Sequence, residues 1–458
     1  MDRESKTETV KRFILNEINA EKIKSGERLP SCREIAGKLS VNKLTVNKAY
    51  HELENEHKVF GISRGGFYLV DSGEVSPGDR KQIDFSIVKP DDRLIPYREF
   101  AHAMNKAVDQ YKHSLFGYDL TIGSLSLRET LKVIFQQDGV YTTSDRILIT
   151  NGSQQAISLV FQFVFRNRKG KLLVEVPTYG LALEFADYLG IAVIGIERKP
   201  DGYDYKNMER IFREENIAAF YVMPRHHNPT GYSLSENDKK RIADLAGKYK
   251  ICIIEDDYLA DVGDKKGSMP IHYYEIEKCS VYIRSFSKTF MPGIRIGAVV
   301  LPATMVETVA KLKHLWDLNT SRLPQAALEI FIKSGMYEKH VKKMRKSYEA
   351  KLRKAEKIFQ DLSPQELDWH VPKHGIFIWI QLPGYINITS LLQMLEKQAI
   401  LIKPASDFFL RQENDQQDYA RHKNCVRLCI SGIPEEDMGS LAVLLSAIRK
   451  FKQLESDR

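Results

Sequence analysis

The chain has 458 residues, of which 43% are apolar and 28% are charged, and its formal net charge is +8. A chain of this length exceeds one ordinary hydrophobic core, so we expect two or three domains in a soluble, globular protein. The sequence contains no apolar run long enough to span a bilayer, and the charged segment 1–11 lacks the apolar core of a signal peptide. We therefore expect a cytoplasmic protein without membrane contact. The mildly basic charge is compatible with nucleic-acid binding but does not require it.

The cysteines predict neither a disulfide framework nor a metal site. There are five of them, an odd number, and no Cys-x-x-Cys pair occurs. Cys425 and Cys429 are four residues apart, but no neighbouring pair of His or Cys completes a metal-ligand set. We expect reduced thiols and no bound metal.

Three regions follow one another along the chain. Residues 1–70 contain short elements separated by turns, and residues 71–84 are polar, contain Gly and Pro, and are typical of a linker. From residue 85 to 458, short apolar runs alternate with amphipathic stretches; the clearest runs are 146–150, 171–176, 218–223, 251–255 and 281–285. This alternation predicts an α/β fold, a mostly parallel sheet with helices on both faces, and a smaller C-terminal subdomain over about 335–458.

The N-terminal region is typical of a helix-turn-helix followed by a hairpin. Apolar spacing predicts a helix over residues 7–20, and Ser31 is a suitable N-cap for a second helix that begins at Cys32. A third helix is predicted over about 43–54. Two short strands, 58–62 and 67–70, are joined by a glycine-containing turn. This order of elements is that of a winged helix-turn-helix.

Polar side chains gather where such a module reads DNA. A recognition helix presents the side chains near its N-terminal end to base edges in the major groove of double-stranded DNA. The candidates for that contact are Asn42, Lys43, Thr45, Asn47 and Lys48. Arg64, at the tip of the hairpin, is placed to reach the neighbouring backbone or minor groove. The alternative is a three-helix interaction module with a solvated basic face.

The motif from Leu29 to Ala36, with the sequence Leu-Pro-Ser-Cys-Arg-Glu-Ile-Ala, resembles the GntR family of DNA-binding domains, as does Leu-Thr-Val-Asn-Lys-Ala-Tyr over 44–50. The resemblance covers nearly all of residues 5–70. It implies that Arg33 contacts phosphate. Many relatives carry Arg on the recognition helix where this chain has Lys43 and Asn47, so their operators do not predict the operator of this protein.

Four motifs occur in order in the larger region. Ser153 and Gln154 belong to a small-residue turn before a helix, where backbone N–H groups and the helix dipole can cradle a phosphate. Asn228 lies in the sequence His-Asn-Pro-Thr-Gly and can donate a hydrogen bond to a phenolate oxygen. Asp256 and Tyr258 end an apolar run, where parallel sheets place ligands. Asp256 could pair with a protonated pyridine nitrogen, and Tyr258 could bond the phenolate.

The fourth motif supplies a lysine and an arginine. Lys288, in Ser-Phe-Ser-Lys at a strand end, can be a Schiff-base nucleophile if its pKa is lowered. Arg295 offers a bidentate contact to phosphate, aided by the hydroxyls of Ser285 and Ser287. Each of the four motifs alone is also compatible with an ordinary turn or surface segment. Together and in this order they resemble the motifs of the fold type I aminotransferases, and that resemblance implies a site for pyridoxal 5'-phosphate.

The order of these motifs resembles the fold type I aminotransferases over roughly residues 85–458. The resemblance implies that Tyr179 stacks on the pyridine ring and that Arg427 binds a substrate carboxylate. It also implies that Tyr118 reaches the phosphate of the partner subunit, and hence a homodimer. Leu181 stands where sensors of γ-aminobutyrate carry an arginine, which argues against that effector.

A GntR-like module fused to such a domain resembles the MocR/GabR family of transcription regulators. The resemblance implies a regulator that binds DNA and uses the cofactor domain to sense an amine, an amino acid or the cofactor itself. The alternative is an active aminotransferase with an appended DNA-binding domain, because Lys288, Asp256, Tyr179 and Arg427 are all present. For the same reason a structural relic that binds no cofactor is disfavoured.

Overall fold

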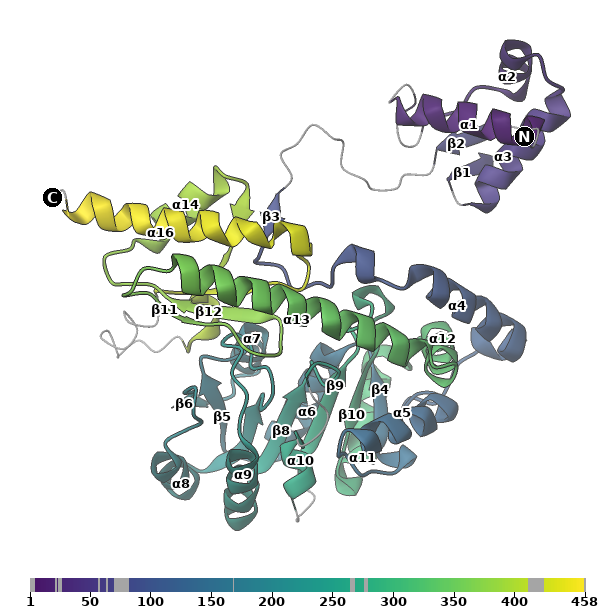
Figure 1. Ribbon diagram of the computed structural model, residues 1–458. Coiled ribbons are helices and arrows are strands. Elements are labelled where there is room, and N and C mark those ends of the chain that lie inside the picture. The colour runs from purple at the N-terminus through teal and green to yellow at the C-terminus, as the bar shows by residue number, and fades with distance from the viewer. Residues whose placement is uncertain are drawn as a thin grey trace. The chain divides into compact units, whose positions relative to one another are not determined.

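The computed structural model describes residues 5–20, 23, 27–56, 58–62, 65–69, 82–167, 169–263, 268–275, 279–410 and 424–456 (Figure 1). The chain divides into two compact units, residues 1–80 and residues 81–458, which we call the N-terminal and C-terminal units. Each unit is described by itself. Among the described residues, none of the helices combines the length and apolarity that crossing a membrane would need.

The N-terminal unit is a winged helix-turn-helix. Its elements are α1 (Lys6–Asn19), α2 (Cys32–Leu39), α3 (Lys43–Asn55), β1 (Val59–Ile62) and β2 (Gly66–Leu69). As predicted, Ser31 caps α2; its hydroxyl accepts from the backbone N–H of Glu34, whose carboxylate accepts from the N–H of Ser31. The antiparallel pairing of β1 with β2 confirms the hairpin. The four α3 residues Val46, Ala49, Tyr50 and Leu53 are fully buried and fix this helix against the rest of the unit.

Within the described residues, the C-terminal unit contains a seven-stranded sheet in the order β4-β10-β9-β8-β7-β5-β6. The strands are β4 (Ile147–Thr150), β5 (Lys171–Val176), β6 (Val193–Glu197), β7 (Ile217–Val222), β8 (Cys252–Asp257), β9 (Val281–Ser285) and β10 (Gly297–Val300). The pairs on the β6 side of β9 are parallel, and β10 is antiparallel to both of its neighbours. The predicted α/β fold with a mostly parallel sheet is thus confirmed. In such sheets, ligands bind at the edge formed by the C-terminal ends of the parallel strands.

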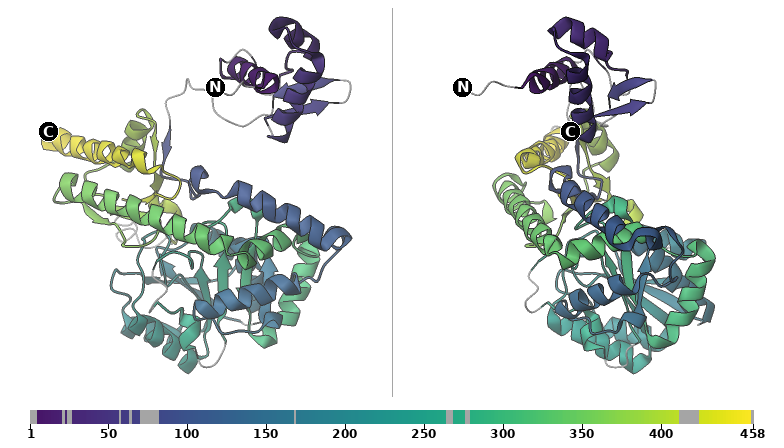
Figure 2. Two further views of the ribbon diagram at one scale, coloured as in Figure 1. Left: turned by 45° about the vertical axis from the view of Figure 1, so that its right-hand side comes forward. Right: turned by 90° about the vertical axis from the view of Figure 1, so that its right-hand side faces the viewer.

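Helices cover both faces of this sheet (Figure 2). They are α4 (Tyr97–Tyr111), α5 (Leu125–Gln137), α6 (Ser153–Asn167), α7 (Gly180–Tyr188), α8 (Tyr205–Glu214), α9 (Glu236–Tyr249), α10 (Ile271–Tyr274), α11 (Ala303–Asp317) and α12 (Arg322–Lys333). Side chains alternate along a strand, so Val174 packs with α6 and α7 in one core cluster while its neighbour Leu173 packs with α8 and α9 in another. Short 3-10 helices lie at 92–94, 112–116, 144–146, 292–294, 405–408 and 435–440.

A second, four-stranded antiparallel sheet follows, in the order β11-β12-β15-β14. The elements are α13 (Met336–Leu362), β11 (Asp368–His370), β12 (Phe377–Gln381), α14 (Ile388–Glu396), β13 (Ile400–Leu401), β14 (Lys403–Pro404), β15 (Cys425–Cys429) and α16 (Leu441–Ser456). We call residues 92–335 the large lobe and residues 336–456 the small lobe. Helix α13 contacts α12 of the large lobe at one end and α16 of the small lobe at the other, as Figure 1 shows.

The start of the C-terminal unit is paired with the small lobe. Strand β3 (Ile83–Asp84) pairs in parallel with β13, with Ile83 opposite Ile400 and Asp84 opposite Leu401. The interval 71–84, predicted as a linker, therefore ends in an ordered strand, and its residues 71–81 lie outside the described part of the chain. The residues after β3 run into the site described next.

Candidate functional site

Lys288 lies after β9, largely buried, where the large lobe faces the segment that follows β3. Its amine donates a hydrogen bond to the backbone carbonyl of Val88 at 2.9 Å. Burial lowers the pKa of Lys288, and the guanidinium groups of Arg295 and Arg427 lower it further, against an opposing effect of the Cys429 thiol. A lowered pKa leaves more of the amine neutral and hence nucleophilic, which is what a Schiff-base lysine needs.

Asp256, at the end of β8, is a buried carboxyl with an unused oxygen. Asp256 is only 3% exposed, and its Oδ2 accepts a hydrogen bond from the Tyr221 hydroxyl at 2.7 Å. The other oxygen, Oδ1, is buried and has no hydrogen-bond partner within the described residues. Burial raises the pKa of Asp256 to about 7. A cationic group placed against Oδ1 would reverse this shift, so the site suits a protonated ring nitrogen.

Tyr179 lies in the same electrostatic environment. Burial raises the pKa of Tyr179 to about 12, with the negative charge of Asp256 adding to the shift and the charge of Arg427 opposing it. Tyr179 lies at the residue before α7, and its hydroxyl makes no capping bond to that helix.

The turn between β4 and α6 forms a cradle closed by an arginine. Gly152 has φ +84°, and a Cβ added there would lie 2.6 Å from Nη2 of Arg295. That Nη2 donates to the carbonyl of Asn151 at 2.9 Å. The amide oxygen of Gln154 is buried without a partner among the described residues. Glycine, guanidinium and the N-terminus of the 15-residue α6, which starts at Ser153, together offer the donors that a phosphate needs.

Ser285 and Ser287 lie beside Lys288 and are both buried. The hydroxyl oxygen of Ser285 accepts from the backbone N–H of Ser287 at 3.2 Å. The hydroxyl hydrogens of both residues remain available to an acceptor.

Arg427, in β15, connects the two lobes. Its Nη1 donates to Oδ1 of Asn228 in the large lobe at 3.1 Å, and its Nη2 donates to the carbonyl of Ser86 at 2.7 Å. The guanidinium lies 4.6 Å from the ring centroid of Phe377, and its buried Nε has no partner in the described residues. Burial lowers the pKa of Arg427. Since Asn228 uses its oxygen here, its amide N–H₂ is the group left to donate to a ligand.

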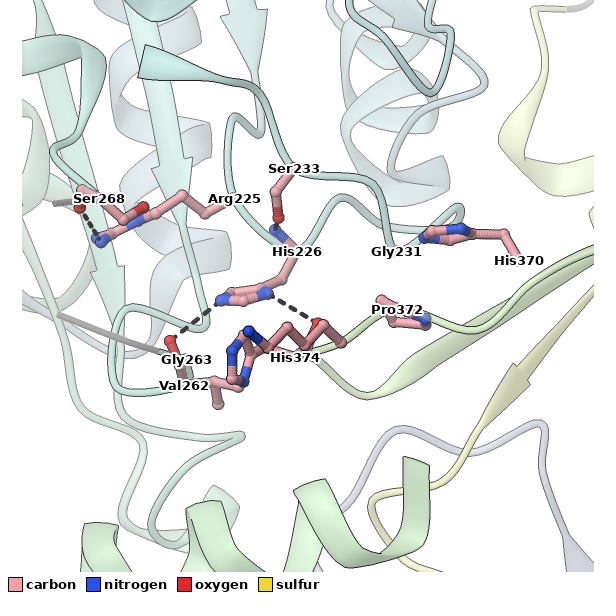
Figure 3. A pocket seen from close by; sticks show the side chains of 11 residues that line it. Arg225, His226, Gly231, Ser233, Val262, Gly263, Ser268, His370, Pro372 and His374 are labelled. Atoms are coloured by element: carbon pink, nitrogen blue, oxygen red, sulfur yellow. Dashed lines mark hydrogen bonds between the residues drawn. The ribbon is translucent and has the colours of Figure 1, made fainter. Parts of the chain in front are cut away.

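Tyr258 lies in the same region but already uses its hydroxyl hydrogen. The hydroxyl donates to the backbone carbonyl of His226 at 2.5 Å. The imidazole of His226 in turn contacts carbonyls of both lobes, those of Val262 at 3.1 Å and His374 at 3.2 Å. Figure 3 shows this imidazole between the two carbonyls, beside a cavity of about 380 Å³. Tyr258 therefore supports the loop that carries Asn228, and it could bond a phenolate only by giving up this contact.

Tyr118 lies on an apolar surface of the large lobe. It is 85% exposed in the isolated chain. Further exposed apolar side chains lie on the same segment and on the end of α11, and the two are joined by a 3.1 Å contact between Thr121 and His314. We call this set the apolar surface: Phe116, Tyr118, Leu120, Leu315, Trp316 and Leu318. A patch of this kind on a soluble protein marks a contact surface.

The side chains predicted to read DNA lie mostly at the exposed start of α3. Arg33, Asn42, Lys43 and Lys48 are exposed, and Thr45 is half-buried. The side-chain oxygen of Asn42 accepts from the N–H of Leu44 at 2.8 Å, so Asn42 is the N-cap of α3 and only its amide hydrogens remain for a base.

Asn47 differs from the other predicted base contacts. It is half-buried, and its amide oxygen lies 3.9 Å from the Cys32 thiol of α2. Arg64, predicted at the wing tip, lies outside the described residues.

The family of the C-terminal unit follows from residues 80–445, which match the model for aminotransferase class I and II. The chain belongs to the aminotransferase class I and II family. Its residues 6–69 match the model for bacterial regulatory proteins of the gntR family. The two matches confirm the predicted pairing of a GntR-like winged helix with an aminotransferase domain. The class I and II fold implies dependence on pyridoxal phosphate.

Relatives of this aminotransferase-family chain share both parts. It is 37% identical to YcxD of Bacillus subtilis (strain 168), an uncharacterized HTH-type transcriptional regulator, over 90% of this chain and 93% of the relative. It is 26% identical to the HTH-type transcriptional regulator NorG of Staphylococcus aureus (strain USA300), over 87% and 96%. A solved structure, the α-aminoadipate aminotransferase LysN of Thermus thermophilus complexed with N-(5'-phosphopyridoxyl)-L-leucine, matches with a TM-score of 0.72 and 23% identity, over 81% of this chain and 93% of that one.

Sequence reasoning missed several groups in this aminotransferase-family chain. The carbonyls of Ser86 and Val88 hold Arg427 and Lys288, but every residue carries a carbonyl, so no sequence signal marks them. Leu44 was not named among the candidate DNA contacts, and the structure leaves it 75% exposed at the start of α3.

Proposed function

We propose that this protein is a transcription regulator that binds double-stranded DNA through its N-terminal unit and binds pyridoxal 5'-phosphate at Lys288. The observation that carries the proposal is the combination, in one chain, of a GntR-type winged helix with exposed cations and an aminotransferase-family unit that retains its half-buried lysine and buried acid. Relatives over nearly the whole chain bear the names of transcriptional regulators.

The residues present fit the cofactor. The unused Oδ1 of Asp256, the glycine cradle under Arg295 and the lowered pKa of Lys288 supply partners for a ring nitrogen, a phosphate and an aldehyde carbon respectively. The bound cofactor supplies an electron sink conjugated to the amine of its ligand. Ser153, Gln154, Ser285 and Ser287 would add contacts to the phosphate, Tyr179 would stack on the ring, and Asn228 with Tyr258 would lie at the phenolate.

The effector in this proposal is an amine or, better, an amino acid. Arg427 is a buried guanidinium whose two donor nitrogens are now held by Asn228 and by the carbonyl of Ser86. A carboxylate would make a bidentate, charge-assisted contact in place of these two neutral acceptors. Such a ligand can shift the protein between two states only by binding one of them more tightly.

The DNA contacts divide by role. Arg33 is exposed at the start of α2 and would contact phosphate, whereas Lys43, Thr45 and Lys48 on α3 would face base edges. Asn42 would contribute through its free amide hydrogens, and Asn47 and Arg64 would complete the contact as predicted from the sequence. Exposed Leu44 would pack on a thymine methyl group if α3 enters the major groove.

We propose a homodimer that acts in the cytoplasm, where its DNA is. The apolar surface defined above supports the dimer, because it leaves Tyr118 and Trp316 open to solvent in a single chain. Tyr118 would reach the partner's phosphate site, so each cofactor site would be completed by the other subunit.

The second candidate is a working aminotransferase with an attached DNA-binding unit. Asn228, the buried Asp256 and Arg427 would also serve such an enzyme, but the relatives over nearly the whole chain are named transcriptional regulators, which favours the regulator. Steady-state transamination with a panel of amino acids and keto acids separates the two functions. A regulator should bind DNA in a ligand-dependent manner without rapid turnover, whereas an enzyme should turn over whether or not DNA is bound.

The test of the regulator is selection of duplexes from a random pool by full-length protein, followed by affinity measurements with and without each amino acid. We expect one enriched sequence and a change in its affinity with at least one amino acid. Arg427→Lys should blunt that response while Arg353→Lys, at an exposed position on α13, should not. Enrichment of no sequence at all would refute the proposal.

A further inference from the structure

A second cavity, larger than the one in Figure 3, lies between α5 and the first turns of α13, apart from the groups around Lys288. Its volume is about 1060 Å³. Its walls come from α5, from the end of α12 and from α13, and the segment after β8 contributes Asp261. All of its lining residues are described, and none of them belongs to the cofactor site or to the apolar surface.

The lining is mainly apolar with a charged rim. Ile134, Tyr337 and Val341 are buried in the wall, while Val133 and Leu125 are more than half exposed at its edge. A concave site of this size, with an apolar wall and a few polar groups, is typical of small-molecule binding. An apolar ligand in this cavity would remove wall surface from water.

Most of the charges on the rim already have partners. Lys132 pairs with Glu129 at 2.6 Å, Lys333 with Glu329 at 2.7 Å, and Lys342 with Glu338 at 2.7 Å. Because each of the three lysines is already paired with a carboxylate, none of them is the first candidate to bind a further anion.

Arg345 is different. Its Nε donates to the backbone carbonyl of Asp261, which fixes the guanidinium in the cavity, and within the described residues its two terminal nitrogens have no hydrogen-bond or ion-pair partner. A planar guanidinium held at one nitrogen and open at the other two is suited to a bidentate contact with a carboxylate or sulfonate.

We propose that this cavity binds a small organic anion with an apolar body, whose acidic group contacts Arg345 and whose body packs on Val133, Ile134 and Tyr337. The charge of the ligand follows from the open guanidinium, and its apolar part follows from the wall. The site itself does not rest on the cofactor or on DNA binding.

The cavity is connected to the Lys288 segment through hydrogen bonds. The carboxylate of Asp261 accepts from the Thr289 hydroxyl at 3.0 Å and from the Tyr337 hydroxyl at 2.6 Å. From the same helix α13, His340 contacts the carbonyl of Thr289 at 2.9 Å and Tyr348 donates to the carbonyl of Lys288 at 3.3 Å. A ligand that packs on Tyr337 and Arg345 therefore packs on the groups that hold the backbone on which Lys288 is mounted.

The test uses 8-anilinonaphthalene-1-sulfonate, a fluorescent anion with an aromatic body, titrated into the full-length protein. We expect a saturable site, with an affinity reduced about tenfold or more in Arg345→Gln, because a charge-assisted contact is lost. Arg353→Gln removes a charge from an exposed position of the same helix and should leave the affinity unchanged. N-Phenyl-1-naphthylamine, which lacks the sulfonate, should bind wild type and Arg345→Gln equally.

A second variant and a second measurement keep the proposal testable if Arg345→Gln fails to fold. Val133→Trp changes an exposed residue at the edge of the cavity and should weaken dye binding, because the larger side chain occupies part of the surface on which the dye packs. Hydrogen exchange of peptides covering 286–291 should slow when dye binds wild type. Equal dye affinities of Arg345→Gln and Arg353→Gln, an unchanged signal in Val133→Trp, or a change of oligomeric state in either cavity variant would overturn the proposal, the last by showing that a second copy occupies this surface.

Discussion

Replacing Asp256 by asparagine should stabilise the protein without cofactor and weaken cofactor binding. Burial raises the pKa of Asp256 to about 7, from a usual value near 4, so the folded chain holds a proton in this interval that the unfolded chain has released. Ionisation of Asp256 therefore lowers the free energy of unfolding as the pH rises. At about 1.4 kcal/mol per pKa unit, the cost is about 2 kcal/mol at pH 5 and about 4 kcal/mol at pH 8.

The amide introduced by Asp256→Asn cannot ionise, and its carbonyl can still accept the Tyr221 hydroxyl, so the variant avoids this cost. With cofactor, the sign reverses, because a buried protonated ring nitrogen would lose its counter-charge. Breaking a buried ion pair by removing one partner costs about 3 to 5 kcal/mol, which is a rise in Kd by roughly two to three and a half powers of ten.

Thermal unfolding of the cofactor-free wild type and Asp256→Asn at pH 5 and pH 8 measures the expected stabilisation. Cofactor titrations of the same two proteins measure the expected loss of affinity. Asp361→Asn is the control, since it neutralises an exposed carboxylate on α13. The gap in midpoint between Asp256→Asn and wild type should widen from pH 5 to pH 8. A narrowing gap would refute the burial argument, and equal cofactor affinity would refute the ring-nitrogen contact.

Three further changes test the remaining roles. Lys288→Ala should abolish the visible absorbance band of bound cofactor while the circular dichroism stays that of the wild type; a persisting band would place the covalent link elsewhere. Arg33→Ala should weaken binding to every duplex and lower the salt slope by about one unit, whereas Lys43→Ala should change the selected sequence at a cost of about 1 to 3 kcal/mol for the cognate base pair. Unchanged affinity of Arg33→Ala for random duplex would remove Arg33 from the interface. Trp316→Asp, in the apolar surface, should give monomers by sedimentation that bind cofactor less tightly; monomers with wild-type cofactor affinity would show that Tyr118 does not complete the partner's site.

Apolar runs were sufficient to predict the centre of the large sheet. The runs at 171–176 and 281–285 coincide with β5 and β9, because buried parallel strands are apolar on both faces. Strands β6 and β10 were not among the predicted runs. In β6 most residues are only half-buried and one is a glycine, whereas β10 begins with a glycine directly after the Arg295 motif.

The chemistry of the candidate site could be predicted from the sequence where it depends on the residue types of the side chains. Lys288, Asp256 and Arg427 could be chosen as site residues from the sequence, because their side-chain chemistry points to a lysine nucleophile, a partner for a ring nitrogen and a carboxylate contact. The groups that hold these side chains in place could not be predicted, because Lys288 and Arg427 donate to backbone carbonyls, which every residue has. Asn42 shows a related limit, because the residue types that cap a helix are also those that can read a base, and only the structure shows the cap.

The covalent path to the N-terminal unit begins beside Lys288 and Arg427. Strand β3 is hydrogen-bonded to the small lobe through β13, and within five residues of it the carbonyls of Ser86 and Val88 accept from Arg427 and Lys288. In the proposed function, Lys288 is the group that binds the cofactor, and Arg427 is the group that binds a carboxylate. In the proposed function, a ligand that binds Lys288 or Arg427 would therefore release a hydrogen bond to the segment that follows β3, and this segment continues along the main chain toward the N-terminal unit.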